Sequence, residues 1–166
     1  MATVVEDGTG LANATSLVAL AGIRSFAEAR GVELTDDDDE LEILVTKSVD
    51  YMKSREAEYS GTRLTDTQSL PWPRTDQYIY GTLVEDGTVP QAAKDYQCQI
   101  ILALDAGVEL MPTHTNDNRP LKRQKTGPLE KEWFDARSSA YVTSIEAALG
   151  PLAYGSGRFG LTVVRI

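Results

Sequence analysis

The residue types that most often carry out nucleophilic, acid–base or metal chemistry are scarce in this sequence. Its 166 residues include one histidine, His114, and one cysteine, Cys98. A serine or cysteine hydrolase would need His114 as its base, and no G-x-S-x-G sequence marks a nucleophile for it. We expect His114 to be a loop residue and Cys98 a small packing residue within a helix. Any two of the 25 acids could converge as a hydrolytic pair, but nothing points to one, so we expect no catalysis, cofactor or metal site.

Two further patterns that could bind a ligand lack the context that such binding requires. Gly155, Gly157 and Gly160 match the G-x-G-x-x-G dinucleotide pattern, but only six residues follow Gly160 in this sequence. The acidic run at residues 36–40 lacks both the spaced ligands and the central glycine of a calcium loop. It is typical of the first turn of a helix, where the helix dipole favours carboxylates.

The charge balance is acidic, with one basic exception. Sixteen Lys and Arg stand against 25 Asp and Glu, a formal net charge of −9, which argues against a protein that coats nucleic acid. Positive charge gathers at Arg119, Lys122, Arg123 and Lys125. These side chains could contact phosphates or an acidic partner, with Trp133 and Phe134 nearby to stack on bases, or they could simply protect a solvated hairpin edge.

The segment around Trp72 is the most distinctive in the chain. Pro71 and Pro73 flank Trp72 and restrict the backbone on both sides, and Arg74 follows. Trp72 could plug the core beneath a long connection, or it could anchor an interface together with Arg74. We predict that Trp72 is largely buried.

The spacing of apolar residues predicts a mainly α fold with four helices. We expect these helices at about 19–30, from Thr35 through Met52, from Pro90 to Gly107 and from Ser138 to Leu149. A Thr-Gly-Pro turn predicts one β-hairpin at about 121–134. An N-terminal arm (1–15), a long ordered connection (54–88) and a C-terminal tail (150–166) complete a single domain, 1–166, with its helical core at 16–149.

Length and composition limit the class of protein. The apolar runs are too short to cross a bilayer, and the N-terminus lacks the basic and apolar regions of a secretory signal. A single cysteine cannot form an intramolecular disulfide, which is typical of a reducing compartment. We therefore expect an intracellular protein that does not bind membranes.

Several short motifs, taken in order, resemble a known family. They are VEDGTG at 5–10, VDYM at 49–52, WPR at 72–74, Val89-Pro90 and KRQKTGP at 122–128. Over about residues 4–149 the chain is similar to the head–tail adaptor (head-completion) proteins of long-tailed bacteriophages. Relatives of this type are often labelled DnaT-like single-stranded DNA-binding proteins.

The resemblance implies a structural role in the neck of a virion, after synthesis in the bacterial host cytoplasm. Such subunits form a ring, commonly twelve-fold, beneath the portal protein. The ring extends the DNA channel and joins the next neck or tail-terminator component. Double-stranded DNA passes through without specific binding, and an acidic lumen would not retain it. The alternative is a single-stranded DNA-binding module that uses residues 119–125 with Trp133 and Tyr154, which the net charge disfavours.

The tail combines glycines with large apolar residues. Four glycines accompany Tyr154, Phe159, Leu161, Val163, Val164 and Ile166. A purely flexible linker would not carry so many large apolar side chains. We expect the tail to dock on a neighbouring subunit or on the portal, either by strand addition or by burying Phe159 and Ile166 in a groove. Arg158 and Arg165 would pair with acids there. Docking of the tail on its own domain is the alternative.

Overall fold

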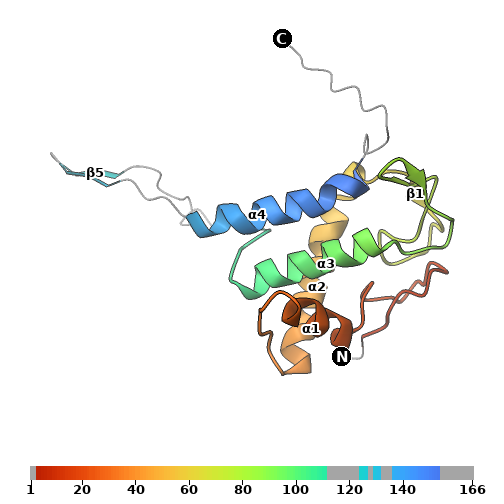
Figure 1. Ribbon diagram of the computed structural model, residues 1–166, viewed down its shortest axis with the longest axis horizontal. Helices are drawn as coiled ribbons and strands as arrows, with labels where there is room; N and C mark the ends of the chain where they lie inside the picture. The colour runs from red at the N-terminus through yellow and green to blue at the C-terminus, as the bar shows by residue number, and fades with distance from the viewer. Residues whose placement is uncertain (1–2, 112–123, 127–128, 132–135, 154–166) are drawn as a thin grey trace, which may run out of the picture.

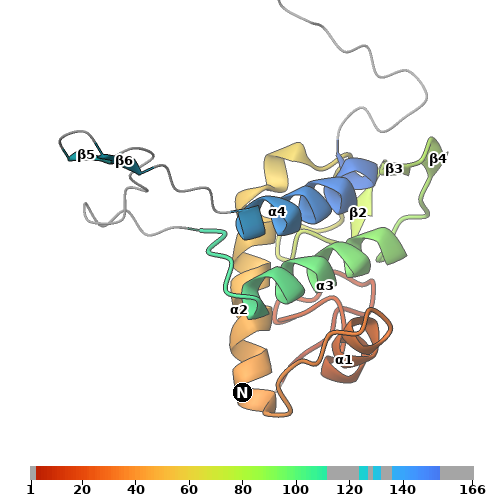
Figure 2. The same cartoon turned by 60° about the vertical axis from the view of Figure 1, so that its left-hand side comes forward.

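The computed structural model describes residues 3–111, 124–126, 129–131 and 136–153, with side chains up to Met111 and from Val142 to Ala153. These residues form four α-helices, confirming a mainly helical fold. The helices are α1 (Leu20–Glu28), α2 (Asp38–Ser54), α3 (Gln91–Asp105) and α4 (Ala136–Leu149). α3 packs against both α4 and α2, and α3 and α4 lie side by side across α2 (Figures 1 and 2).

The first two helices follow the expected apolar spacing. α1 buries Ile23 and Ala27 and has no side-chain cap at its N-terminus. α2 begins three residues after the expected Thr35, because the side chain of Asp37 caps it by accepting a hydrogen bond from the backbone N–H of Asp39 at 2.9 Å. The acidic run thus surrounds a helix N-terminus, as predicted.

The last two helices differ from the predictions only at their ends. Pro90 is the N-cap of α3 rather than its first helical residue, and Gly107 follows the helix with φ +81°. α4 starts two residues earlier than expected. Gly150-Pro151 does not end the helical path abruptly, because a 3₁₀ turn, η2 (Gly150–Leu152), continues it and buries Leu152 completely.

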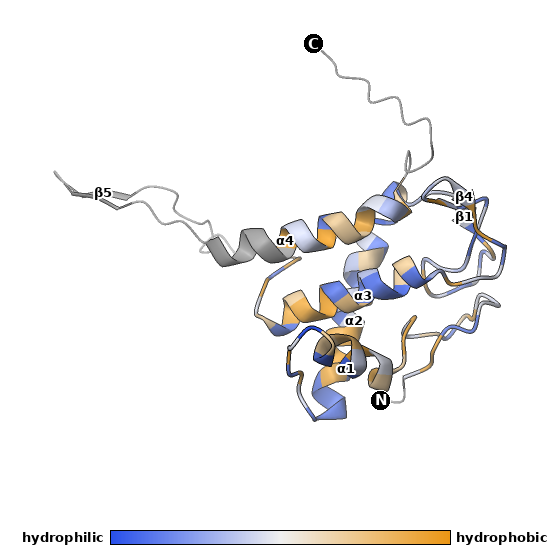
Figure 3. Ribbon diagram, viewed as in Figure 1, coloured by the Kyte–Doolittle hydropathy of each residue, from blue (hydrophilic) through white to orange (hydrophobic). Residues whose placement is uncertain are grey.

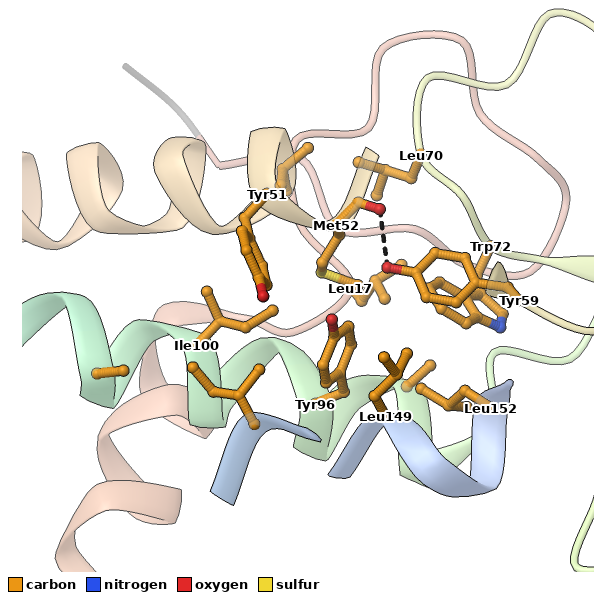
Figure 4. Packing of buried hydrophobic residues seen from close by; sticks show 14 of the residues in the cluster. Leu17, Tyr51, Met52, Tyr59, Leu70, Trp72, Tyr96, Ile100, Leu149 and Leu152 are labelled. Atoms are coloured by element: carbon orange, nitrogen blue, oxygen red, sulfur yellow. Dashed lines mark hydrogen bonds between the residues drawn. The ribbon is translucent and has the colours of Figure 1, made fainter. Parts of the chain in front are cut away.

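The core lies where the helices meet the long connection. Its largest fully buried side chains include Leu17, Met52, Tyr59, Leu70, Trp72, Tyr96, Ile100 and Leu152, seen together in Figure 4. A smaller cluster joins α1, α2 and α3 through Ile23, Leu41, Val45, Cys98 and Ile101. Apolar positions recur between polar ones along α2 and α3 (Figure 3), as amphipathic helices require.

The connection between α2 and α3 is ordered, as expected, and it contains strand pairs that were not predicted. After a 3₁₀ turn, η1 (Glu56–Glu58), strand β1 (Thr62–Arg63) pairs with β2 (Arg74–Thr75), and β3 (Tyr78–Ile79) pairs with β4 (Thr82–Leu83). The predicted hairpin is confirmed in a shorter form, with β5 (Gln124–Thr126) antiparallel to β6 (Leu129–Lys131). The expectation of a single hairpin was therefore wrong.

The N-terminal arm packs against its own chain. The carboxylate of Glu6, which is 5% exposed, accepts hydrogen bonds from the backbone N–H groups of Gly8, Gly10 and Leu11 at 2.9–3.0 Å. The hydroxyl of Ser69 donates to the carbonyl of Ala14 at 2.5 Å. The arm is thus fixed to the long connection by residues of the same subunit.

Candidate functional site

Most of the candidate interaction residues lie outside the described part of the chain. They are Arg119, Lys122, Arg123, Tyr154, Arg158, Phe159, Arg165 and Ile166, and the same holds for His114, Trp133 and Phe134. Lys125 belongs to β5, of which the structure describes the backbone. Trp72 and Arg74 are fully described.

Trp72 is a core residue, as predicted. Its side chain is completely buried, and its ring centroid lies 4.4 Å from that of Tyr59. The indole Nε1–H donates a hydrogen bond to Oε1 of Gln77 at 3.0 Å, which satisfies the only polar atom of the side chain. Trp72 therefore fastens the long connection to the core rather than presenting a ring to a partner.

Arg74 is likewise enclosed, since it is only 4% exposed. Its guanidinium donates hydrogen bonds to the carbonyl oxygens of Ser60, Gly61 and Pro71 at 2.7–3.2 Å. It also lies 3.5 Å from the carboxylate of Glu56. Arg74 thus ties β2 to the start of the connection, and in this structure it is not at the surface where an interface residue was expected.

Glu56 joins two arginines of the connection. Its carboxylate binds the guanidinium of Arg63 through both oxygens and also approaches Arg74. The hydrogen bonds from Arg63, with a smaller contribution from the charge of Arg74, lower the pKa of Glu56 below its ordinary value of 4.5. These contacts join η1 to strands β1 and β2.

The β3–β4 hairpin exposes three large apolar side chains. Tyr78, Tyr80 and Leu83 are 46%, 78% and 53% exposed. Tyr80 and Gly81 form the two-residue turn, both with positive φ (50° and 78°), as in the tight turns that connect hairpin strands. Ile79 packs against the core, so the hairpin is anchored while its other side chains face solvent. Exposed aromatic side chains of this kind are typical of protein-contact surfaces.

A second surface feature lies where α2 meets the end of α3, and we call it the α2–α3 groove. One hollow of about 580 Å³ is lined by residues of α2 and by 107–111, and a second of about 270 Å³ adjoins it, with Leu104 common to both. Ile43 and Met111 line the two hollows and are 55% and 52% exposed. The groove is thus an apolar depression open to solvent.

The groove carries more acidic than basic side chains. Glu40, Asp50, Asp105 and Glu109 line it, and Lys47 is the one cation among its lining residues. The charges of the described groove therefore sum to −3, which favours a basic over an acidic occupant.

Charge is unevenly divided along the chain. Residues 3–111 hold 20 acids and 8 Lys or Arg, a formal charge of −12, whereas residues 112–166 hold 5 acids and 8 Lys or Arg, or +3. A nucleic-acid surface needs positive charge directed outward. Any phosphate contact is therefore expected from the later segment rather than from residues 3–111.

The arginines of residues 3–111 all make contacts within the chain. Arg24 pairs with Asp38 and Arg63 with Glu56, Arg55 pairs with Glu58 and Glu146, Arg74 is buried, and Arg30 lies over the ring of Phe26. The remaining cations in that stretch are three lysines. The described surface thus has no cluster of arginines directed at a ligand.

The structure assigns Cys98 to the core. It is 2% exposed, and burial raises the pKa of its thiol to about 12, so the reactive thiolate is strongly disfavoured at neutral pH. Within the described residues no three His, Cys, Asp or Glu side chains converge as metal ligands do. None of the described helices combines the length and apolar character that a bilayer-spanning segment requires.

Neither surface feature was predicted from the sequence. The hairpin had a local signal, since Tyr80-Gly81 separates two short runs of strand-favouring residues. The groove had none, because its lining combines two helices and a loop that are separated in sequence.

Comparison with known proteins identifies a family. A family described as "Putative DnaT-like ssDNA binding protein" matches residues 1–166. No curated protein and no solved structure matches this sequence. Because the match extends over the whole chain, this protein belongs to the DnaT-like ssDNA-binding protein family.

Proposed function

We propose that this protein is a structural head–tail adaptor of a tailed bacteriophage. It forms a ring, twelve-fold by analogy with the adaptors that its motifs resemble, between the portal and the next neck or tail-terminator component. The ring extends the channel through which double-stranded DNA passes. The protein acts in the virion neck without catalysis or cofactor.

The observation that carries this proposal is the character of the described surface. It offers apolar features for protein contact, the β3–β4 hairpin and the α2–α3 groove, whereas the arginines of residues 3–111 are engaged within the chain. A formal charge of −12 over residues 3–111 also suits a wall that must not retain passing DNA.

A second candidate function is single-stranded DNA binding, which the family's description favours. The basic residues Arg119, Lys122, Arg123 and Lys125 would then contact phosphates. If all four did so, log K would fall against log salt with a slope of about −3, since each neutralised phosphate of a single strand contributes about −0.7.

Two measurements separate the candidates. Native mass spectrometry of the protein with the portal should detect a ring and its complex if the adaptor proposal is right. Titration with an oligonucleotide at two salt concentrations should then show no tight, salt-dependent binding. Oligonucleotide binding with a steep salt dependence would favour the second function, provided that it is lost in the variant Lys122→Glu/Arg123→Glu/Lys125→Glu. The control variant Lys47→Glu/Lys53→Glu should keep this binding.

A truncation tests the role of the tail. Leu152 is completely buried and Ala153 pairs with Tyr59, so the deletion should begin at residue 154. We expect deletion of 154–166 to leave a folded protein that no longer joins the portal. Normal assembly by the truncated protein would show that the tail is not needed for it.

A further inference from the structure

The α2–α3 groove has the chemistry of a site for an apolar, basic peptide. Leu104 lines both of its hollows, and Ile43 and Met111, which line one hollow each, are exposed. The volume of its larger hollow, about 580 Å³, falls within the range of ligand sites. The carboxylates at its rim would pair with cationic side chains of the occupant.

The segment 154–166 of this chain matches these requirements. It contains Tyr154, Phe159, Leu161, Val163, Val164 and Ile166, two arginines and no acidic residue. Its charge of +2 opposes the −3 of the groove, and its apolar residues recur along its length. We propose that the α2–α3 groove binds residues 154–166 of a second copy of this chain. This inference rests on the proposed ring and names the contact that would close it.

The position of the tail favours a second copy over the same one. Ala153, the last described residue, pairs with Tyr59, whose ring contacts Tyr96 in the first half of α3. The groove lies at the other end of that helix, around Leu104 and residues 107–111. A helix of the length of α3 measures about 22 Å.

Docking within one subunit would therefore be inefficient. An extended chain covers at most about 3.3–3.6 Å per residue, so about four residues of the tail would be used to cover the roughly 12 Å of α3 between Tyr96 and Leu104. Tyr154 would then lie outside the groove, so the tail could not bury all of its apolar side chains there. A tail from a neighbouring copy has no such limit. The contact joins different surfaces of two copies, which is the kind that generates rings.

Cross-linking between differently tagged full-length chains tests the proposal. One chain carries Met111→Cys and the other Phe159→Cys, and the mixture is mildly oxidised. The native Cys98 should not compete, since it is buried and its thiol has a raised pKa. We expect a disulfide between the two tagged chains. As a control, Tyr80→Cys replaces Met111→Cys on a more exposed surface and should give several-fold less product.

Charge reversal supplies an independent test. We expect the double variant Arg158→Glu/Arg165→Glu to associate with itself more weakly than the unmodified chain. Mixing it with the double variant Asp105→Arg/Glu109→Arg should restore association, because the charges of tail and groove are then opposite again. Cross-linking no stronger than the Tyr80→Cys control would overturn the proposal. So would a cross-link that forms only within one chain when both cysteines are on it.

Two different results would contradict the groove assignment and the adaptor function. If Arg158→Glu/Arg165→Glu still forms a ring on the portal as the unmodified chain does, the groove assignment is wrong while the adaptor function stands. If the unmodified chain forms no ring and no portal complex by native mass spectrometry, the adaptor function itself is wrong.

Discussion

Replacement of Trp72 by alanine should be among the most damaging single changes in the described part of this protein. The side chain is completely buried, and truncation of a large aromatic residue in a core costs about 3–5 kcal/mol. The change also removes the ring contact with Tyr59, worth about 1 kcal/mol, and leaves Oε1 of Gln77 without its donor. Since these contributions overlap, we expect a loss of about 4–5 kcal/mol.

The loss should be measured by urea unfolding followed by circular dichroism. For a chain of this size, 4–5 kcal/mol lowers the Tm by roughly 8–20 °C. Trp72→Phe separates packing from hydrogen bonding, because it keeps most of the ring but not the indole N–H. Tyr80→Ala, on the exposed hairpin, is the control and should change stability by less than about 0.5 kcal/mol. A loss below about 1 kcal/mol for Trp72→Ala would refute the assignment of this residue as a core anchor.

Two further predictions concern the loops. Because Arg63 lowers the pKa of Glu56, the carboxylate stabilises the fold above its ordinary pKa of 4.5, and that stability is lost as the pH falls through the lowered value. Glu56→Gln should therefore reduce the fall in Tm between about pH 5 and pH 3, and an unchanged pH profile would contradict the pairing. Gly8→Ala would place its Cβ 2.1 Å from the carbonyl oxygen of Gly87, at φ +100°. It should destabilise the protein by more than about 1 kcal/mol in urea, and by more than Gly31→Ala, which has φ +69° and no neighbour within 4 Å.

The helices could be predicted because local signals agreed with the tertiary structure. In α2 the acidic first turn and the apolar spacing led to the right helix, and its buried polar residue Ser48 has hydrogen-bond partners in α2 and in α3. Ser48 is buried, and its hydroxyl donates to the carbonyl of Val45 at 2.7 Å and accepts from the side chain of Gln97 at 3.3 Å. The observed helix ends differ from the predicted ends by at most three residues. At the start of α2 the difference arises because the side chain of Asp37 caps the helix.

The connection between α2 and α3 was less predictable because its contacts are not periodic. The proline–tryptophan–proline segment indicated a buried Trp72 correctly. The burial of the adjacent Arg74 was not predicted, since a charged residue is usually exposed and its three carbonyl partners cannot be seen in the sequence. The strand pairs of this region are two residues long, too short for an alternating pattern to emerge.

The contacts between η2 and the long connection determine which part of the fold would bear a mechanical force applied to the tail. The backbone N–H of Ser60 donates to the carbonyl of Leu152 at 2.8 Å, and Ala153 pairs with Tyr59. The hydroxyl of Tyr59 in turn donates to the carbonyl of Met52 in α2 at 2.7 Å (Figure 4). A force applied to the tail would therefore act first on α2 and the buried aromatic cluster, through these hydrogen bonds. Only after they break would it unwind α4 from its C-terminal end.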